Sequence, residues 1–187
     1  MIWSMKIEVV APEDFKFKQS SSFFLDSNIW MYLNFPEHTD VPQRVINRYS
    51  AFFKLLLTKQ SLIQTNLIQM SELINLIINQ EYIAWRKNNS AKTRKDFRID
   101  PAFKKALSKA KTLTNAVLKC STLRDGIFNS EQMKAMVDKC DKADFNDIYF
   151  ADFCELTDVI LVTHDYDFGA LDKDVTIISA NDKYLSS

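Results

Sequence analysis

The chain has 187 residues, of which 47% are hydrophobic and 26% are charged, and its 24 basic residues balance its 24 acidic ones. This length and hydrophobic content predict one globular domain with a substantial core and exclude an intrinsically disordered chain. Two glycines, Gly126 and Gly169, are too few and too far apart for the glycine-rich loops that bind dinucleotides or nucleoside triphosphates. The elbow that carries a nucleophilic serine is excluded for the same reason.

Histidine and cysteine are scarce as well. Two histidines exclude a histidine-rich metal site, and three isolated cysteines predict neither a zinc site nor a disulfide framework. No apolar run is long enough to span a membrane, and the N-terminus becomes charged too early for a signal peptide. We therefore expect a cytoplasmic protein that makes no contact with membranes.

Apolar runs and helical periodicities alternate along the chain after a lead-in of residues 1–21. The predicted strands are a short one at Lys6–Val10, Ser22–Leu25, Ser61–Thr65, Val159–Val162 and Val175–Ile178, of which we expect at most four to be firm, and a further strand is a candidate near Thr122–Phe128. The predicted helices are Val41–Lys59, about Leu67–Arg86, about Pro101–Lys119, a short helix capped by Ser130, and Asp144–Glu155. Strands that alternate with helices indicate an α/β fold with a mostly parallel sheet.

Charge is segregated along the chain. A net charge of zero argues against a nucleic-acid partner only if the charges are evenly spread. Residues 86–111 contain ten bases and two acids, a net charge of +8, whereas residues 131–187 carry −8. The basic block is either a solvated helical face or a footprint for a polyanion.

Four acids occupy similar places in the predicted elements. Asp26 ends the first firm strand, Glu72 and Asp147 lie in early turns of helices, and Asp165 closely follows Val159–Val162. Since the carboxyl ends of parallel strands share one edge of a sheet, these acids are expected to converge. Convergent carboxylates without histidine or cysteine favour a hard cation such as Mg²⁺ or Mn²⁺, although each acid alone is also explained as a turn residue or a helix cap.

At these positions the sequence resembles the PIN-domain ribonucleases, which include the VapC-type toxins. The motifs are Phe23–Trp30 with an acid and an Asn two residues later, Gln69–Leu73, Asp144–Ala151 with an Asp opening an apolar helix, and Ile160–Phe168 with Thr-x-Asp after a strand. Together they cover residues 22–179, nearly the whole chain.

The resemblance implies a three-layer α/β/α sandwich and endoribonuclease chemistry dependent on Mg²⁺ or Mn²⁺. It implies one PIN-like domain over residues 22–187, with a basic helical insertion at about 86–130. Metal ligands would be Asp26, Glu72, Asp147 and Asp165, with Asp144 or Asp167 as auxiliary acids. Asp144 and Asp147 compete for the third position, and we favour Asp147.

Further roles follow from the same resemblance. Asn28 would orient the site, and Thr163 would support it or contact substrate. Candidate partners are RNA, an antitoxin protein and a second copy of the chain. The expected contacts to the RNA backbone are Arg86, Lys87, Lys92, Arg94, Lys95 and Arg98, with Trp85 and Phe97 as candidates for stacking on bases.

Two other functions remain open. One is a PIN-like module that binds RNA or a protein without cleaving it. The other is a phosphatase with an acidic site, although the Asp-x-Asp pattern of one such class is broken here by Asn28.

Overall fold

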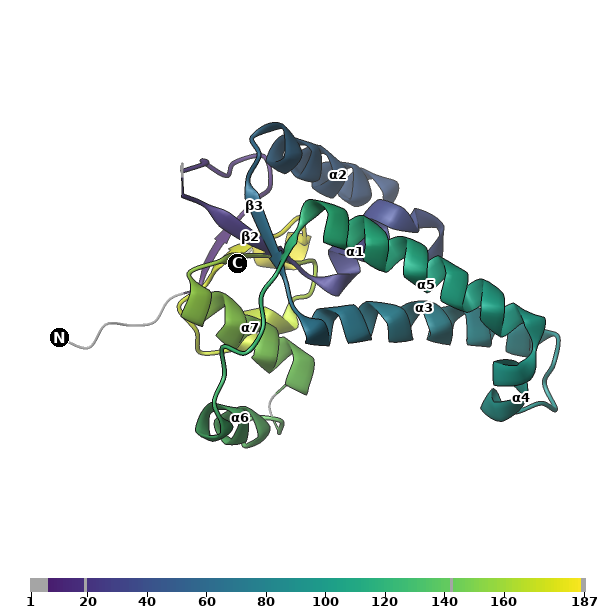
Figure 1. Ribbon diagram of the computed structural model, residues 1–187. Coiled ribbons are helices and arrows are strands. Elements are labelled where there is room, and N and C mark those ends of the chain that lie inside the picture. Colours follow the sequence, from purple (N-terminus) through teal and green to yellow (C-terminus); the bar gives the residue numbers. More distant parts are fainter. Residues whose placement is uncertain (1–6, 19, 142, 186–187) are drawn as a thin grey trace.

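The computed structural model describes residues 7–18, 20–141 and 143–185 (Figure 1). Its centre is one sheet in which every neighbouring pair of strands is parallel, in the order β1-β6-β5-β2-β3-β4. The strands are β1 (Glu8–Val10), β2 (Ser22–Leu25), β3 (Leu62–Thr65), β4 (Thr122–Leu123), β5 (Ile160–Val162) and β6 (Thr176–Ile178). The α/β expectation is confirmed, and the two short edge strands, candidates at Lys6–Val10 and near Thr122–Phe128, pair with the central four as β1 and β4.

Helices fill the connections between the strands. They are α1 (Ser27–Asn34), α2 (Gln43–Thr58), α3 (Leu67–Lys87), α4 (Arg94–Ile99), α5 (Pro101–Cys120), α6 (Ser130–Val137), α7 (Phe145–Thr157) and α8 (Asp182–Leu185). Helices α1, α4 and α8 were not predicted, because they are too short to show a helical period clearly. The predicted cap of α6 at Ser130 is wrong, since Asn129 caps this helix in a reciprocal arrangement with Gln132.

Alternation along the strands builds a layer of helices on each face of the sheet. In β2, Phe23 and Leu25 pack on α1, α2, α3 and α5, whereas Phe24 packs on α6 and α7. Leu161 and Val162 of β5 point to opposite faces in the same way. Helices thus cover both faces of the sheet, which suits the apolar runs of its central strands β2 and β5, and the chain forms the expected three-layer α/β/α sandwich (Figure 1).

The residues before β2 belong to the same core. β1 pairs with β6 at one edge of the sheet, with Val9 opposite Ile177. Phe15 and Phe17 form a ring cluster with Phe23 and Phe52. Lys6, the first residue of the strand expected at Lys6–Val10, lies outside the described residues.

Helices α3 and α5 pack side by side and extend beyond the sheet as an arm, with α4 at its tip (Figure 1). Leu73 and Ile77 of α3 and Ala110 and Leu113 of α5 are buried and belong to the same core cluster. Residues 86–130, which include the whole basic block, form the end of this arm, α4, α5, β4 and the connection to α6. No described helix combines the length and the hydrophobicity needed to cross a bilayer.

The order of the strands fixes where a site can form. From β2 the chain moves one way to β3 and β4, and then returns to the other side of β2 for β5 and β6. In open α/β sheets, ligands bind at the carboxyl ends of the strands where this direction reverses. That place is the end of β2 and β5, where Asp26 and Thr163 follow the strands.

Tyr49 of α2 lies in the core and forms hydrogen bonds with the segments at this edge of the sheet. Its buried hydroxyl donates to the carbonyl oxygen of Thr163 at 2.9 Å and accepts from the amide of Ala180 at 2.8 Å. The same hydroxyl lies 3.1 Å from Nδ1 of His164. One side chain thus links α2 to the segments that follow β5 and β6.

We expect Tyr49→Phe to lower the free energy of unfolding by about 2–3 kcal/mol, because it leaves a buried carbonyl and a buried amide unpaired. Urea unfolding followed by circular dichroism measures the change. Tyr166→Phe, at an exposed position, serves as the control and should cost less than about 0.5 kcal/mol. Equal effects of the two substitutions would contradict this assignment.

Candidate active site

Asp26 stands at the junction between β2 and α1, and its side chain is only 6% exposed. Its backbone amide continues the sheet by donating to Val162 of β5 at 2.9 Å. Its carboxylate caps α1 by accepting from the amide of Ser27 at 2.6 Å. A buried carboxylate is tolerated only when its oxygens are hydrogen-bonded, and this one is bound at both oxygens.

Thr163 and Asn28 complete the shell of Asp26. The Thr163 hydroxyl donates to Oδ2 of Asp26 at 2.7 Å, and Nδ2 of Asn28 donates to the same oxygen at 2.5 Å. Thr163 Oγ1 also accepts from the backbone amide of Asp165 at 2.9 Å. The amide of His164 donates to Oδ1 of Asn28 at 3.3 Å. These bonds fix the loop after β5 against the end of β2.

Glu72 reaches this edge because α3 is anchored one turn earlier. The buried Gln69 donates to the carbonyl of Leu25 at 2.6 Å and accepts from the hydroxyl of Thr65 at 2.7 Å. Oε2 of Glu72 then accepts from the hydroxyl of Ser27 at 2.8 Å, and its carboxylate also accepts a hydrogen bond from Asn146. Elements β2, β3 and α7 therefore all help to position Glu72.

The remaining acids come from α7 and from the loop after β5. Asp144 is the exposed N-cap residue of α7, and Asp147 lies half-buried in its first turn. Asp165 is half-buried, and its Oδ1 accepts from the amide of the exposed Asp167 at 2.9 Å. The structure thus brings all six predicted acids to the carboxyl edge of the sheet.

The acids alter one another's ionisation. Burial, together with the charges of Glu72 and Asp147, raises the pKa of Asp26 to about 7, although the Thr163 hydrogen bond opposes the shift. Burial and the charge of Asp165, followed by those of Asp144, Glu72 and Asp167, raise the pKa of Asp147 to about 7. Burial also raises the pKa of Glu72. Each carboxylate therefore lies within electrostatic reach of others in the cluster.

The acidic cluster has no ion-pair partner in the part of the chain that the structure describes. Among the described residues, no lysine, arginine or histidine forms a salt bridge with any of the six acids. Within the same part of the chain, no three acidic, histidine or cysteine side chains are arranged to hold a metal ion. The carboxylates of Asp26 and Glu72 are instead bound by hydrogen bonds from Ser27, Asn28 and Thr163.

The residues expected to contact RNA lie at the end of the arm. Arg86 and Lys87 end α3, Lys92 lies in the following loop, and Arg94, Lys95 and Arg98 are on α4; all six are exposed. Phe97, proposed for stacking on bases, is 0% exposed and packs against Tyr82, Trp85 and Phe103. That expectation is wrong for Phe97, because the small helix α4 needs an apolar anchor to stay on the arm.

Two residues that shape the site were not singled out from the sequence. Ser27 and Asn146 both bind the Glu72 carboxylate. Each is adjacent to a predicted acid, and this adjacency is the only signal in the sequence. Their partner is far away along the chain, so the contact becomes visible only in the folded structure.

Comparison with known proteins supports the fold. No protein-family model and no curated protein matches the sequence. A chain of the solved structure of VapBC2 from Rickettsia felis, bound to a DNA fragment from their promoter, is similar with a TM-score of 0.53 and 15% identity. The match covers 86% of this chain and 99% of that chain. At this identity it shows a shared fold, which is consistent with the PIN-like architecture.

We expect Asp147→Asn to stabilise the protein at pH 8 by about 1 kcal/mol when divalent cations are chelated. The folded-state pKa of about 7 lies above the ordinary Asp pKa of 3.8, so ionisation of Asp147 opposes folding. This cost is absent below pH 4, grows as the pH rises, and is complete above pH 7. Solvent near this half-buried group keeps the effect well below the full value of the shift.

Urea unfolding at pH 4, 6 and 8 measures the difference between the variant and the wild type. Asp14→Asn, a substitution of an exposed acid outside the cluster, is the control and should show no such trend. A variant less stable than the wild type at pH 8 would contradict the electrostatic cost.

Proposed function

We propose that the protein is a metal-dependent endoribonuclease that hydrolyses phosphodiester bonds of single-stranded RNA. The observation that carries the proposal is the convergence of Asp26, Glu72, Asp147 and Asp165 at the reversal point of the sheet, with no basic partner among the described residues. Mutual repulsion at such a place costs stability and is retained in proteins where it serves a site.

The donor chemistry of the cluster fits Mg²⁺ or Mn²⁺, since it offers carboxylate, hydroxyl and amide oxygens without histidine or cysteine ligands. Asp26, Glu72, Asp147 and Asp165 would hold the ion, with Asp144 and Asp167 close by. Their side chains would have to approach one another, and a cation removes the repulsion that opposes this movement. When bound, such an ion lowers the pKa of a water molecule and neutralises the charge on the leaving oxygen.

Thr163 and Asn28 are positioning residues in this proposal. Both donate to Oδ2 of Asp26, so they restrict its carboxylate to one orientation and leave Oδ1 with the α1 amide. Thr163 also accepts a hydrogen bond from the backbone amide of Asp165, so it positions two of the proposed ligands, Asp26 and Asp165. Preorganised groups of this kind reduce the reorganisation needed during a reaction.

The toxin of a toxin–antitoxin pair is the biological role that we propose for this nuclease. The similar chain comes from a structure of VapBC2, and this likeness supports a protein partner that acts as an antitoxin. A homodimer and a cytoplasmic location are further parts of the same proposal.

The direct test is cleavage of end-labelled single-stranded RNA by purified protein with Mg²⁺ or Mn²⁺. We expect Asp26→Asn and Asp165→Asn to reduce the rate about 100-fold or more, because loss of a ligand removes several kcal/mol of stabilisation from the transition state. Asp14→Asn should cleave like the wild type. Equal cleavage by the wild type and the two site variants would indicate a contaminating nuclease and would overturn the proposal.

A second function, a binding module without catalysis, is favoured by one observation. Among the described residues, the carboxylates are not arranged to hold an ion without rearrangement. Such a module would bind RNA or a protein with the same affinity in chelator and in Mg²⁺, and would release no product. Turnover that depends on the cation would exclude it.

A further inference from the structure

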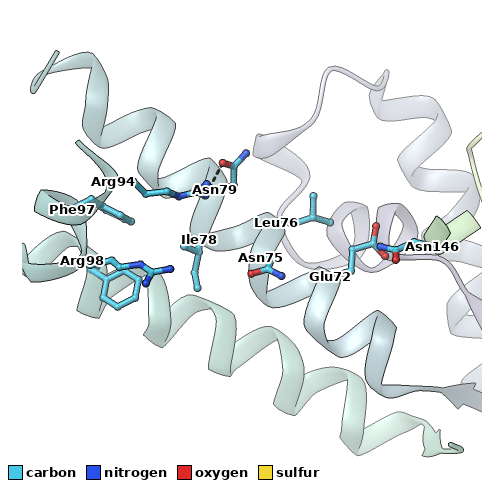
Figure 2. A pocket seen from close by; sticks show the side chains of 10 residues that line it. Glu72, Asn75, Leu76, Ile78, Asn79, Arg94, Phe97, Arg98 and Asn146 are labelled. Carbon is cyan, nitrogen blue, oxygen red and sulfur yellow. Dashed lines mark hydrogen bonds between the residues drawn. The ribbon is translucent and has the colours of Figure 1, made fainter. Parts of the chain in front are cut away.

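A groove with a volume of about 510 Å³ runs along α3 from the acidic cluster to the tip of the arm. Figure 2 shows Glu72 and Asn146 at one end, Arg94 and Arg98 at the other, and Asn75 between them. The lining therefore carries an acid at one end and two arginines at the other, with Asn75 and apolar side chains such as Ile78 between them. Its acidic end is the face of the proposed active site formed by Glu72.

The two arginines at the basic end keep donors available. Arg98 is exposed and has no hydrogen-bond or ion-pair partner among the described residues. Arg94 donates from Nη2 to Oδ1 of Asn79 at 3.0 Å and lies 5.2 Å from the ring centre of Tyr82, which orients its side chain. A guanidinium has five N–H donors, so both residues can still bind a phosphate with two parallel hydrogen bonds.

The spacing suits a strand rather than a single phosphate ion. Arg94 and Arg98 are four residues apart on α4, so they share a face with about 6 Å between their Cβ atoms. Along α3, Asn79 lies two turns beyond Glu72, a distance of roughly 10 Å. At about 3.4 Å per stacked nucleotide, this distance accommodates about three nucleotides.

We propose that this groove is the channel for the RNA backbone, in which Arg94 and Arg98 bind the strand about three nucleotides from the bond placed at the acidic cluster. The inference rests on the proposed nuclease function and adds a minimum substrate length to it. A nucleic-acid strand fits better than an acidic protein segment because its phosphates are evenly spaced and the groove leads into the cluster proposed to act on them.

Binding tests the channel without any cleavage. A labelled oligouridylate of about twelve nucleotides is titrated with protein in chelator while salt is varied and fluorescence anisotropy is recorded. The double variant Arg94→Ala/Arg98→Ala should bind about tenfold or more weakly, and the slope of log affinity against log salt should flatten by about 1.4, which corresponds to two lost phosphate contacts.

The matched control is Lys105→Ala/Lys111→Ala, which removes two charges from exposed positions of α5 outside the groove. We expect its affinity to stay within about threefold of the wild type and its slope to be unchanged. Equal losses in the two double variants would overturn the channel, because binding would then depend only on overall charge. If binding of a polyglutamate peptide requires Arg94 and Arg98 while binding of RNA does not, the choice of RNA as the occupant is overturned.

A ladder of RNA lengths with Mn²⁺ separates this inference from the nuclease proposal. The wild type should cleave much faster once the strand extends about three nucleotides beyond the cut on one side, and the arginine double variant should lose this step. If both proteins cleave at rates that do not depend on RNA length, the channel is overturned and the nuclease proposal stands. Binding that depends on the arginines, without any cleavage by the wild type, supports the channel and overturns the nuclease.

Discussion

The structure depends on a buried carboxylate at the junction of the two central strands. Asp26 follows β2, caps α1 and accepts a hydrogen bond from Thr163 after β5, so one side chain links three elements. Burial of a carboxylate is costly, and the hydrogen bonds of Thr163 and Asn28 offset part of this cost. The acids around it add electrostatic repulsion, and the burial of apolar side chains in the layers of the fold offsets this cost. The carboxyl edge is thus under electrostatic strain that a cation would relieve.

Opposite charges are arranged along one surface rather than mixed. The acids come from α3, α7 and the segments that follow β2 and β5, whereas Arg94 and Arg98 are on α4 at the far end of the arm. Helix α3 connects the two regions, because it carries Glu72 near its start and packs against α4 and α5 near its end. The net charge of zero therefore results from two oppositely charged regions, one for the proposed cation and one for the proposed RNA backbone.

Much of the fold could be predicted from sequence because its signals are local. The run Ser22–Leu25, the periodicity of the long helices and the acids that follow strands all depend on neighbouring residues, and these elements appear nearly where expected. Helix α4 was not predicted, because its place depends on a distant partner, namely the packing of Phe97 on Tyr82 of α3. The contacts of Ser27 and Asn146 with Glu72 also join distant segments, so no local pattern announces them.

A crystal grown with Mn²⁺ and measured at a wavelength where manganese scatters anomalously tests the cation site most directly. The account predicts an anomalous peak at the carboxyl edge, with oxygens of at least three of Asp26, Glu72, Asp147 and Asp165 at about 2.0–2.6 Å from it. These side chains should have moved toward one another around the ion. No peak among them at saturating Mn²⁺, or peaks only elsewhere on the surface, would contradict the account.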